Sequence, residues 1–321
     1  MLIISQEEIK REIKLHQFVD AIEQAMMIHE SGEFEMPLRM EVDFGKDSLL
    51  LMPCAIKKVF GTKLVSLFPN NPVNNHPVIY GLVILNDGNT GEPLALMNGA
   101  LITGLRTSAM ASLSIKYMTD KNVSKLGMIG AGIQGYYQTL MACSVRNFTD
   151  IYLSDINPQK LDELQLKLQN NLPDVNIHKK KSPDEVLKTS DVIITATNTT
   201  IPLFANNEAL FSEKHFVAIG SYKPEMREYP QAIYNRLDHV FIDTDHAFHE
   251  TGDLITPLKE GWISKEQVVS FGKILTGKIQ LPKNTNPTLF KSVGMALFDV
   301  VTANMIYQIA KEKGFGMDVV L

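Results

Sequence analysis

A glycine-rich turn constrains the fold of this chain more than any other feature. Gly130-Ala131-Gly132-Ile133-Gln134-Gly135 directly follows the apolar run Leu126–Ile129 and opens a helical stretch. The first glycine of such a turn permits the tight bend, the second lets the backbone approach a pyrophosphate, and the third lets helix and strand pack closely. The helix amino terminus presents free N–H groups to the phosphates. The pattern predicts a dinucleotide contacted by Gly130, Gly132, Ile133, Gln134 and Gly135.

A carboxylate stands at the end of the next apolar run. Ile151–Leu153 leads to Asp155, near the spacing of roughly 20 residues at which an acid accepts hydrogen bonds from the adenosine ribose. A carboxylate there repels a 2′-phosphate and favours NAD(H), whereas the nearby Lys160 leaves NADP(H) open. For the glycines alone, the alternative is a tight turn that binds no ligand.

Short apolar runs alternate with helical or polar stretches between residues 119 and 288. They lie at Leu126–Ile129, Ile151–Leu153, Val192–Thr195, Phe216–Ile219 and Val240–Ile242. This alternation predicts parallel strands covered on both faces, and therefore a Rossmann-type NAD(P)-binding domain over 119–288. Thr197 and Asn198 follow the third run, at the end of a strand where such sheets bind ligands, so we expect them beside the nicotinamide.

Residues 1–118 predict a different architecture. Ser5 and Glu8 can form a capping box for one amphipathic helix that ends at Ser31-Gly32. Strand-like runs then follow at 49–52, 63–68, 78–85 and 94–97, with a hairpin loop from Asn86 to Gly91 and a helix over 107–118. A last long helix, from about Leu289 to Ala310, is expected to return to this domain within 289–321. The predicted fold class is α/β, with the Rossmann-type domain joined to a mainly antiparallel α+β substrate domain.

The net charge and the number of cysteines exclude several classes of binding partner and indicate the cellular compartment. Lys and Arg total 31 against 36 Asp and Glu, a formal net charge of −5, which gives no general attraction to nucleic acid or to an anionic membrane. The two cysteines, Cys54 and Cys143, exclude a disulfide-framed fold and a four-cysteine zinc site. We find no signal peptide and no apolar run of about 18 residues, so we expect a cytoplasmic protein.

Three cations stand in apolar or glycine-bounded settings in the first domain: Arg39, Lys63 and Arg106. Arginine can hold a carboxylate with two parallel hydrogen bonds, and a buried lysine can pass a proton to a carbonyl or imine. The cluster of metal-ligand types between Asp243 and Glu250 fits a loop beside the cofactor better than a metal site, and we expect no metal.

Several motifs together resemble the ornithine cyclodeaminase and mu-crystallin family along nearly the whole chain. They are Gly61-Thr62-Lys63-Leu64-Val65-Ser66 with Pro69 and Asn71-Pro72, Gly104-Leu105-Arg106-Thr107-Ser108-Ala109, the Gly130 turn, and Phe290-Lys291-Ser292-Val293-Gly294 with Ala296 and Asp299. The resemblance implies NAD(P) binding and a homodimer formed by the substrate domains. It also implies that Arg39, Lys63 and Arg106 bind the substrate α-carboxylate, that Lys63 lies near the reacting atoms, and that Thr107 caps a helix beside the cofactor.

Departures from the family pattern direct the choice of reaction. Tyr222 stands where ornithine cyclodeaminases carry an aspartate, and Leu50 where an acid precedes their Leu-Met-Pro. The prediction is therefore an NAD(P)-dependent oxidoreductase that reduces a small cyclic imino acid, such as 1-pyrroline-2-carboxylate or a related ketimine, or oxidises the corresponding amino acid. Tyr222 could donate a hydroxyl to the substrate or simply pack. The alternatives are an ammonia lyase with catalytic NAD and a non-catalytic mu-crystallin-like binding protein.

Overall fold

The computed structural model describes residues 1–281 and 286–320. The chain forms two compact units, unit 1 from Met1–Arg106 and Met295–Leu321, and unit 2 from Thr107–Gly294. The boundaries thus lie within one long helix, α3 (Gly99–Met118), and just before another, α11 (Ala296–Lys313). The change of pattern after Met118, which suggested a boundary at 118/119, marks the end of α3 instead.

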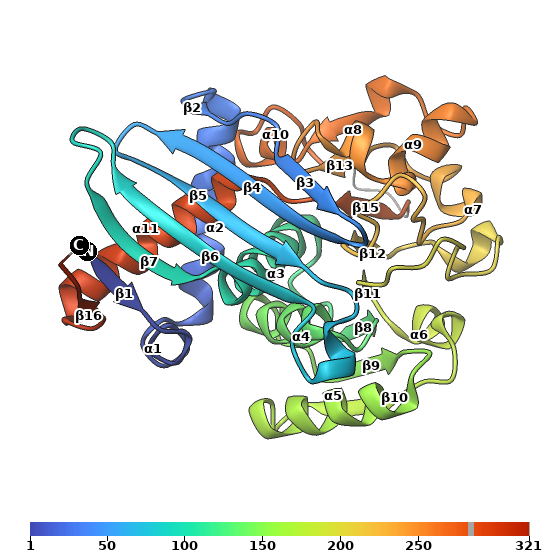
Figure 1. The fold of residues 1–321 in the computed structure, drawn as a ribbon. Coiled ribbons are helices and arrows are strands. Elements are labelled where there is room, and N and C mark those ends of the chain that lie inside the picture. The colour runs from blue at the N-terminus through green and yellow to red at the C-terminus, as the bar shows by residue number, and fades with distance from the viewer. Residues whose placement is uncertain (282–285, 321) are drawn as a thin grey trace. The chain divides into compact units, whose positions relative to one another are not determined.

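Unit 1 is built on a mainly antiparallel sheet, as predicted. Its strands are β1 (Leu2–Ile4), β2 (Phe34–Glu35), β3 (Met40–Phe44), β4 (Asp47–Ile56), β5 (Val59–Leu67), β6 (Ile79–Asp87), β7 (Pro93–Asn98) and β16 (Met317–Asp318). They run in the order β16-β1-β7-β6-β5-β4-β2, with β3 also on β4, and β1 is parallel to β7. A short 3₁₀ turn, η1 (Asn71–Asn74), precedes β6. Helices α11 and α2 (Leu15–Ser31) lie behind this sheet in Figure 1.

The amino-terminal helix is not continuous. The predicted capping box is present, because Ser5 and Glu8 exchange hydrogen bonds at the start of α1 (Gln6–Glu12). However, the backbone becomes extended at Ile13 and a new helix, α2, begins at Leu15. There the N–H of Lys14 donates to the Oε1 of Gln17 at 2.9 Å, and the N–H of Gln17 donates to the carbonyl oxygen of Lys14 at 3.0 Å. Ile13 is buried, and this break lets it pack inward although it lies outside both helices.

Two other helix predictions have wrong starting points. Helix α3 begins at Gly99, where the Oδ1 of Asn98 accepts a hydrogen bond from the N–H of Leu101 at 2.8 Å, rather than near Thr107. The long carboxy-terminal helix begins at Ala296, not Leu289. The predicted helical spacing around Leu289 belongs to a buried strand, because Leu289 and Phe290 lie in β15 (Thr288–Lys291).

Unit 2 is a parallel sheet between helices, which confirms the predicted Rossmann-type class. Its strands are β8 (Lys125–Ile129), β9 (Asp150–Ser154), β10 (Asn176–Lys179), β11 (Val192–Thr195), β12 (His215–Ala218), β13 (Val240–Ile242), β14 (Val268–Ser270) and β15. The order is β10-β9-β8-β11-β12-β15-β13-β14, and each pair is parallel. Strands β10, β14 and β15 were not predicted from the sequence. Strand β15, the last in this unit, lies between β12 and β13.

The helices of unit 2 follow its strands. They are α4 (Ile133–Val145), α5 (Pro158–Asn171), α6 (Pro183–Thr189), α7 (Gln231–Tyr234), α8 (Ala247–Glu250), α9 (Gly252–Lys259) and α10 (Gly272–Leu275), with 3₁₀ turns η2 (Glu208–Leu210) and η3 (Lys265–Gln267). A core of aliphatic and aromatic residues, including Phe211, Phe216 and Tyr229, fills the space against one side of the sheet. Within residues 1–281 and 286–320, no helix is both long enough and apolar enough to span a membrane.

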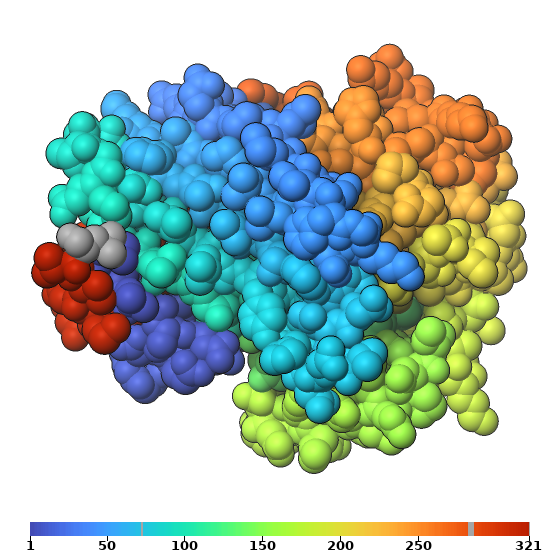
Figure 2. All heavy atoms as spheres, viewed as in Figure 1, coloured from blue at the N-terminus to red at the C-terminus, as the bar shows by residue number. Residues whose placement is uncertain are grey.

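The unit 1 sheet is apolar on both faces. One face, with Met52, Val65 and Val83, is buried. On the other face, Met40, Leu51, Leu64 and Leu82 form one row across β3, β4, β5 and β6. Met40 and Leu82 are 59% and 44% exposed, and this face looks toward the viewer in the blue-to-teal part of Figure 2. We call it the outer sheet face. Antiparallel sheets commonly turn polar residues toward water on one face, so an apolar outer face is unusual for this kind of sheet.

Candidate functional site

The glycine-rich turn of unit 2 has the geometry that the sequence predicted. Gly130 has φ +108°, and a Cβ there would lie 2.5 Å from the carbonyl oxygen of Ala196. A Cβ on Gly135 would lie 2.1 Å from the carbonyl oxygen of Gly130, so α4 packs too tightly on the turn for any larger residue. Gly132 is different. It precedes the first residue of α4, and a Cβ there would meet open space. Its missing side chain therefore serves no internal packing and leaves room for a ligand to approach the backbone.

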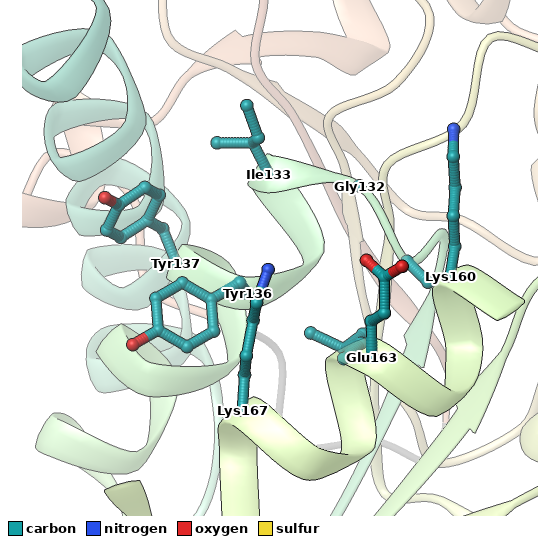
Figure 3. Close-up of a pocket in the computed structure, with 9 residues that line it drawn as sticks. Gly132, Ile133, Tyr136, Tyr137, Lys160, Glu163 and Lys167 are labelled. Carbon is teal, nitrogen blue, oxygen red and sulfur yellow. The ribbon is translucent and has the colours of Figure 1, made fainter. Parts of the chain in front are cut away.

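A cleft of about 620 Å³ opens beside this turn. Figure 3 shows Gly132 and Ile133 at its upper end, Tyr136 and Tyr137 from α4 on one side, and Lys160, Glu163 and Lys167 from α5 on the other. Ile133 is 73% exposed. The two lysines and the free N–H groups at the start of α4 make this end of the cleft suitable for negatively charged groups.

Asp155 follows β9 and lies against the turn. Its Oδ2 accepts a hydrogen bond from the N–H of Ala131 at 2.6 Å, and its Oδ1 one from Asn157 at 2.7 Å. Each oxygen of a carboxylate can accept a further hydrogen bond. The carboxylate is thus fixed in direction by the backbone and still able to accept from other donors. Its contact with the adenosine ribose stays a prediction.

The other predicted cofactor contacts of unit 2 lie just after β11 and in the first turn of α4. Thr197 is half-buried, and both its N–H and its hydroxyl donate to the carboxylate of Glu228, at 2.8 and 2.7 Å. Asn198 is exposed. Gln134, in the first turn of α4, accepts a hydrogen bond from the side chain of Gln138 at 3.1 Å. Sequence reasoning missed Glu228, because a glutamate within a polar loop looks like a solvated residue.

These observations together fit a nicotinamide dinucleotide. Gly132 would leave room for the pyrophosphate, the N–H groups at the start of α4 would bind it, and Asp155 would bind the adenosine ribose. Parallel sheets bind ligands where the strand order reverses, which here is between β8 and β11. The glycine turn follows β8 and Thr197 follows β11, so the predicted contacts flank that point.

Unit 1 holds a buried cluster of charged residues. Asp299, in the first turn of α11, is fully buried. Its Oδ1 accepts a hydrogen bond from the Nε of Arg106 at 3.0 Å, and its Oδ2 lies 2.8 Å from the Nζ of Lys63 in an ion pair. Lys63 and Arg106 are themselves buried. The sequence analysis gave roles to both cations, whereas it named Asp299 only as part of a motif and gave no role to this carboxylate, which brings the cations together.

The pKa of Lys63 is set by effects that act in opposite directions. The net pKa of Lys63 is lowered to about 8: burial lowers it most, Arg106 and Arg39 lower it further, and Asp299 partly offsets them by raising it. The influence of Arg39 shows that this third predicted cation lies in the same neighbourhood. A lysine with this pKa holds its proton at neutral pH yet can release it, as a general acid must.

Other predicted residues are placed differently. Thr107 is buried in the interior of α3 and cannot cap that helix, which begins at Gly99. Tyr222 lies in the loop after β12 and is 49% exposed. Leu50 pairs with Val65 in β4 and β5, two residues along the strand from the pair formed by Met52 and Lys63. It therefore occupies the same sheet face as Lys63.

Asp243, the first residue of the cluster between Asp243 and Glu250, has a structural role. Asp243 is fully buried, and its carboxylate accepts hydrogen bonds from the hydroxyl of Ser292 at 2.6 Å and the N–H of Gly294 at 2.8 Å. It joins the ends of β13 and β15. Asp253, in α9, lies 3.7 Å from the Nζ of the buried Lys291, and burial raises the pKa of Asp253 to about 6.

Comparisons with known proteins agree with this architecture. A Δ¹-pyrroline-2-carboxylate reductase from Bacillus cereus is 30% identical over 323 residues, covering 98% of each chain. An alanine dehydrogenase from Archaeoglobus fulgidus is 30% identical over 317 residues, covering 98% of this chain and 97% of that one. The structure of the Thermococcus litoralis Δ¹-pyrroline-2-carboxylate reductase in complex with NADH and L-proline superposes with a TM-score of 0.92 at 30% identity, covering 99% of this chain and all of that one. A family model matches residues 1–314. The chain belongs to the ornithine cyclodeaminase/mu-crystallin family.

Proposed function

We propose that the protein is an NADH-dependent reductase of a small cyclic imino acid, such as 1-pyrroline-2-carboxylate, and that it also oxidises the corresponding amino acid in reverse. The observation that carries this proposal is the buried Lys63–Asp299–Arg106 cluster of unit 1. The relatives named for the same reaction, and the NADH and L-proline in the solved structure, support it.

Unit 1 supplies the groups that hold and protonate the substrate. Arg106, with Arg39, would bind the substrate carboxylate, because a guanidinium has several N–H donors and Arg106 contacts Asp299 through its Nε. Lys63 would donate a proton or a hydrogen bond to the imine nitrogen, and a protonated imine accepts hydride at carbon more readily. Bound NADH supplies that hydride, so C=N becomes CH–NH and NAD⁺ is left. NADPH remains a second donor to be tested.

The same geometry argues against the ammonia-lyase alternative. That reaction was expected to need carboxylates at the positions of Leu50 and Tyr222. Leu50 is an apolar side chain on the sheet face of Lys63, and Tyr222 is a half-exposed phenol. Neither side chain supplies the carboxylate that the lyase reaction needs at that position.

One pair of assays tests the proposal. The full-length protein is given NADH and 1-pyrroline-2-carboxylate, and the loss of NADH absorbance is followed; separately it is given ornithine and NAD⁺, and ammonia is measured. We expect steady NADH oxidation and no ammonia. Ammonia release without net cofactor turnover would favour the lyase, and activity in neither assay would favour a non-catalytic binding protein.

We also propose that the protein is a homodimer formed through the outer sheet face, and that it works in the reducing cytoplasm. The apolar row from Met40 to Leu82 supports the first point. The free Cys54 and Cys143, whose pKa values burial raises to about 12, support the second. Leu82→Glu should give a monomer in sedimentation, while Leu166→Glu, at an exposed site on α5, should leave the dimer intact. A Leu82→Glu variant that stays dimeric contradicts this interface.

A further inference from the structure

Glu228 is a fully buried carboxylate to which the proposed reaction gives no task. Its Oε1 accepts hydrogen bonds from the N–H and the hydroxyl of Thr197, at 2.8 and 2.7 Å. Its Oε2 accepts from the hydroxyl of Thr195 and the N–H of Gly220, both at 2.9 Å. Every partner is a donor, which suits an ionised carboxylate that can only accept. A buried charge with this many donors is held in one orientation.

The carboxylate joins the ends of two neighbouring strands. Thr195 is the last residue of β11 and Thr197 follows it, whereas Gly220 follows β12. The two segments touch directly, because a Cβ on Gly220 would lie 2.0 Å from the carbonyl oxygen of Thr197. Glu228 bridges them from a third segment of the chain.

The backbone of Glu228 is anchored as firmly as its side chain. Its N–H donates to the Oδ1 of the buried Asp253 at 2.7 Å. Its carbonyl oxygen accepts from the N–H of Leu203 at 2.8 Å. The residue therefore has little freedom, and the loop geometry at Thr197 is set by groups that are already rigid before any ligand binds.

The place of this bridge in the sheet indicates which part of a dinucleotide it serves. Asp155 after β9 and the glycine turn after β8 would take the adenosine and the pyrophosphate. Strands β11 and β12 come next in the sheet order, on the other side of β8. A ligand that runs from Asp155 past Gly132 continues over the ends of β11 and β12, so the nicotinamide half would lie there.

We propose that Glu228 is a positioning residue for the nicotinamide half of the cofactor, acting through Thr197 and Gly220. This inference rests on the proposed function only in taking the ligand of unit 2 to be NAD(H). It gives the loop between β12 and α7 a defined task that the polar sequence around Glu228 does not suggest.

The test compares two ligands that share the adenosine half. NADH and ADP-ribose are titrated separately into the full-length protein and into Glu228→Gln, by fluorescence and by calorimetry. The amide of glutamine replaces one acceptor oxygen by a donor. Each oxygen of Glu228 receives one backbone N–H, which cannot turn away, so one hydrogen bond is lost in either orientation of the amide. We expect NADH to bind about 10- to 100-fold more weakly and ADP-ribose to stay within about twofold.

Thr195→Val is the matched control. It removes one buried donor to Glu228 but leaves those of Thr197 and Gly220 in place, so NADH affinity should change by less than about threefold. If Glu228→Gln does not fold, Glu228→Asp decides, because it keeps the buried charge but cannot reach all four donors. It should show the same selective loss for NADH.

Equal weakening of both ligands, or no weakening of NADH, would overturn the assignment, since a purely structural residue has no reason to distinguish them. The proposed function can fail independently. Wild-type protein that binds NADH and ADP-ribose but never oxidises NADH with an imino acid would reject the reaction and leave the role of Glu228 intact.

Discussion

Asp299→Asn should move the alkaline limit of imine reduction toward acid pH. Burial and two neighbouring arginines lower the pKa of Lys63, and Asp299 is the counter-charge that raises it, with a net pKa of about 8. Asparagine keeps the size of the side chain but removes its negative charge, 2.8 Å from the Nζ of Lys63. An opposite charge at this range shifts a pKa by about 1–3 units, equivalent to about 1.4–4 kcal/mol. The pKa of Lys63 should therefore fall to roughly 5–7 in the variant.

The assay is the pH profile of kcat/KM for NADH oxidation with 1-pyrroline-2-carboxylate, which reports ionisations of the free enzyme and free substrate. Lys63 must be protonated to act, so the wild-type rate should fall as pH rises through about 8. At pH 7.5, a shift of two units would leave the variant about 25-fold slower through protonation alone. Ionisation of the substrate affects both proteins alike, so the difference between the profiles is the measured quantity.

A folded Asp299→Asn variant that is slower but still loses activity near pH 8 would refute this reasoning, because the group that titrates would not be Lys63. Lys63→Met serves as the second variant. This variant should be slow at every pH, and its rate should not show the fall near pH 8 that we assign to the lysine.

Three further predictions concern individual residues. Arg106→Ala should cost about 2–4 kcal/mol in kcat/KM, measured by steady-state kinetics, because it removes a buried anchor for the substrate carboxylate; an unimpaired variant would reject that role. Gly132→Ala should weaken NADH binding with little change in melting temperature, whereas Gly135→Ala should lower the melting temperature by about 4 °C or more, since only the second Cβ meets protein atoms. Asp155→Asn should raise the preference for NADPH over NADH, read as a ratio of KM values, by about tenfold or more, because a repulsive charge is lost; an unchanged ratio would remove Asp155 from the ribose site.

Local patterns were predictable where neighbouring residues carry the whole signal. The Gly130 turn and the hairpin after Asn86 each depend on residues close together in the chain, and the structure has both as expected. Asp155 accepts a hydrogen bond from that turn, and its contact with a ribose stays a prediction. The break at Ile13 was not predictable, because neither proline nor glycine marks it. Strand β15 merged with the apolar spacing of the helix that follows, since Leu289 and Phe290 suit either structure.

The candidate sites were harder to predict because their partners are distant in sequence. Asp299 lies 193 residues from Arg106, and no local spacing connects them. Glu228 is separated from Thr195 by 33 residues and looks like any glutamate in a polar loop. The cations themselves were recognisable because each stands among apolar residues or glycines. The carboxylates that hold them, or that hold the backbone, become visible only once tertiary contacts form.

The late position of β15 and α11 in the chain bears on how the protein is made. While the ribosome is still translating, β12 and β13 have emerged but the strand that separates them has not. Lys63 likewise lacks its buried counter-charge until Asp299 has been synthesised. Both units thus reach their final packing only after β15 and α11 have been synthesised. A nascent chain that stalls before Thr288 leaves a gap in one sheet and an uncompensated lysine in the other unit, which makes it a natural substrate for chaperones and proteases.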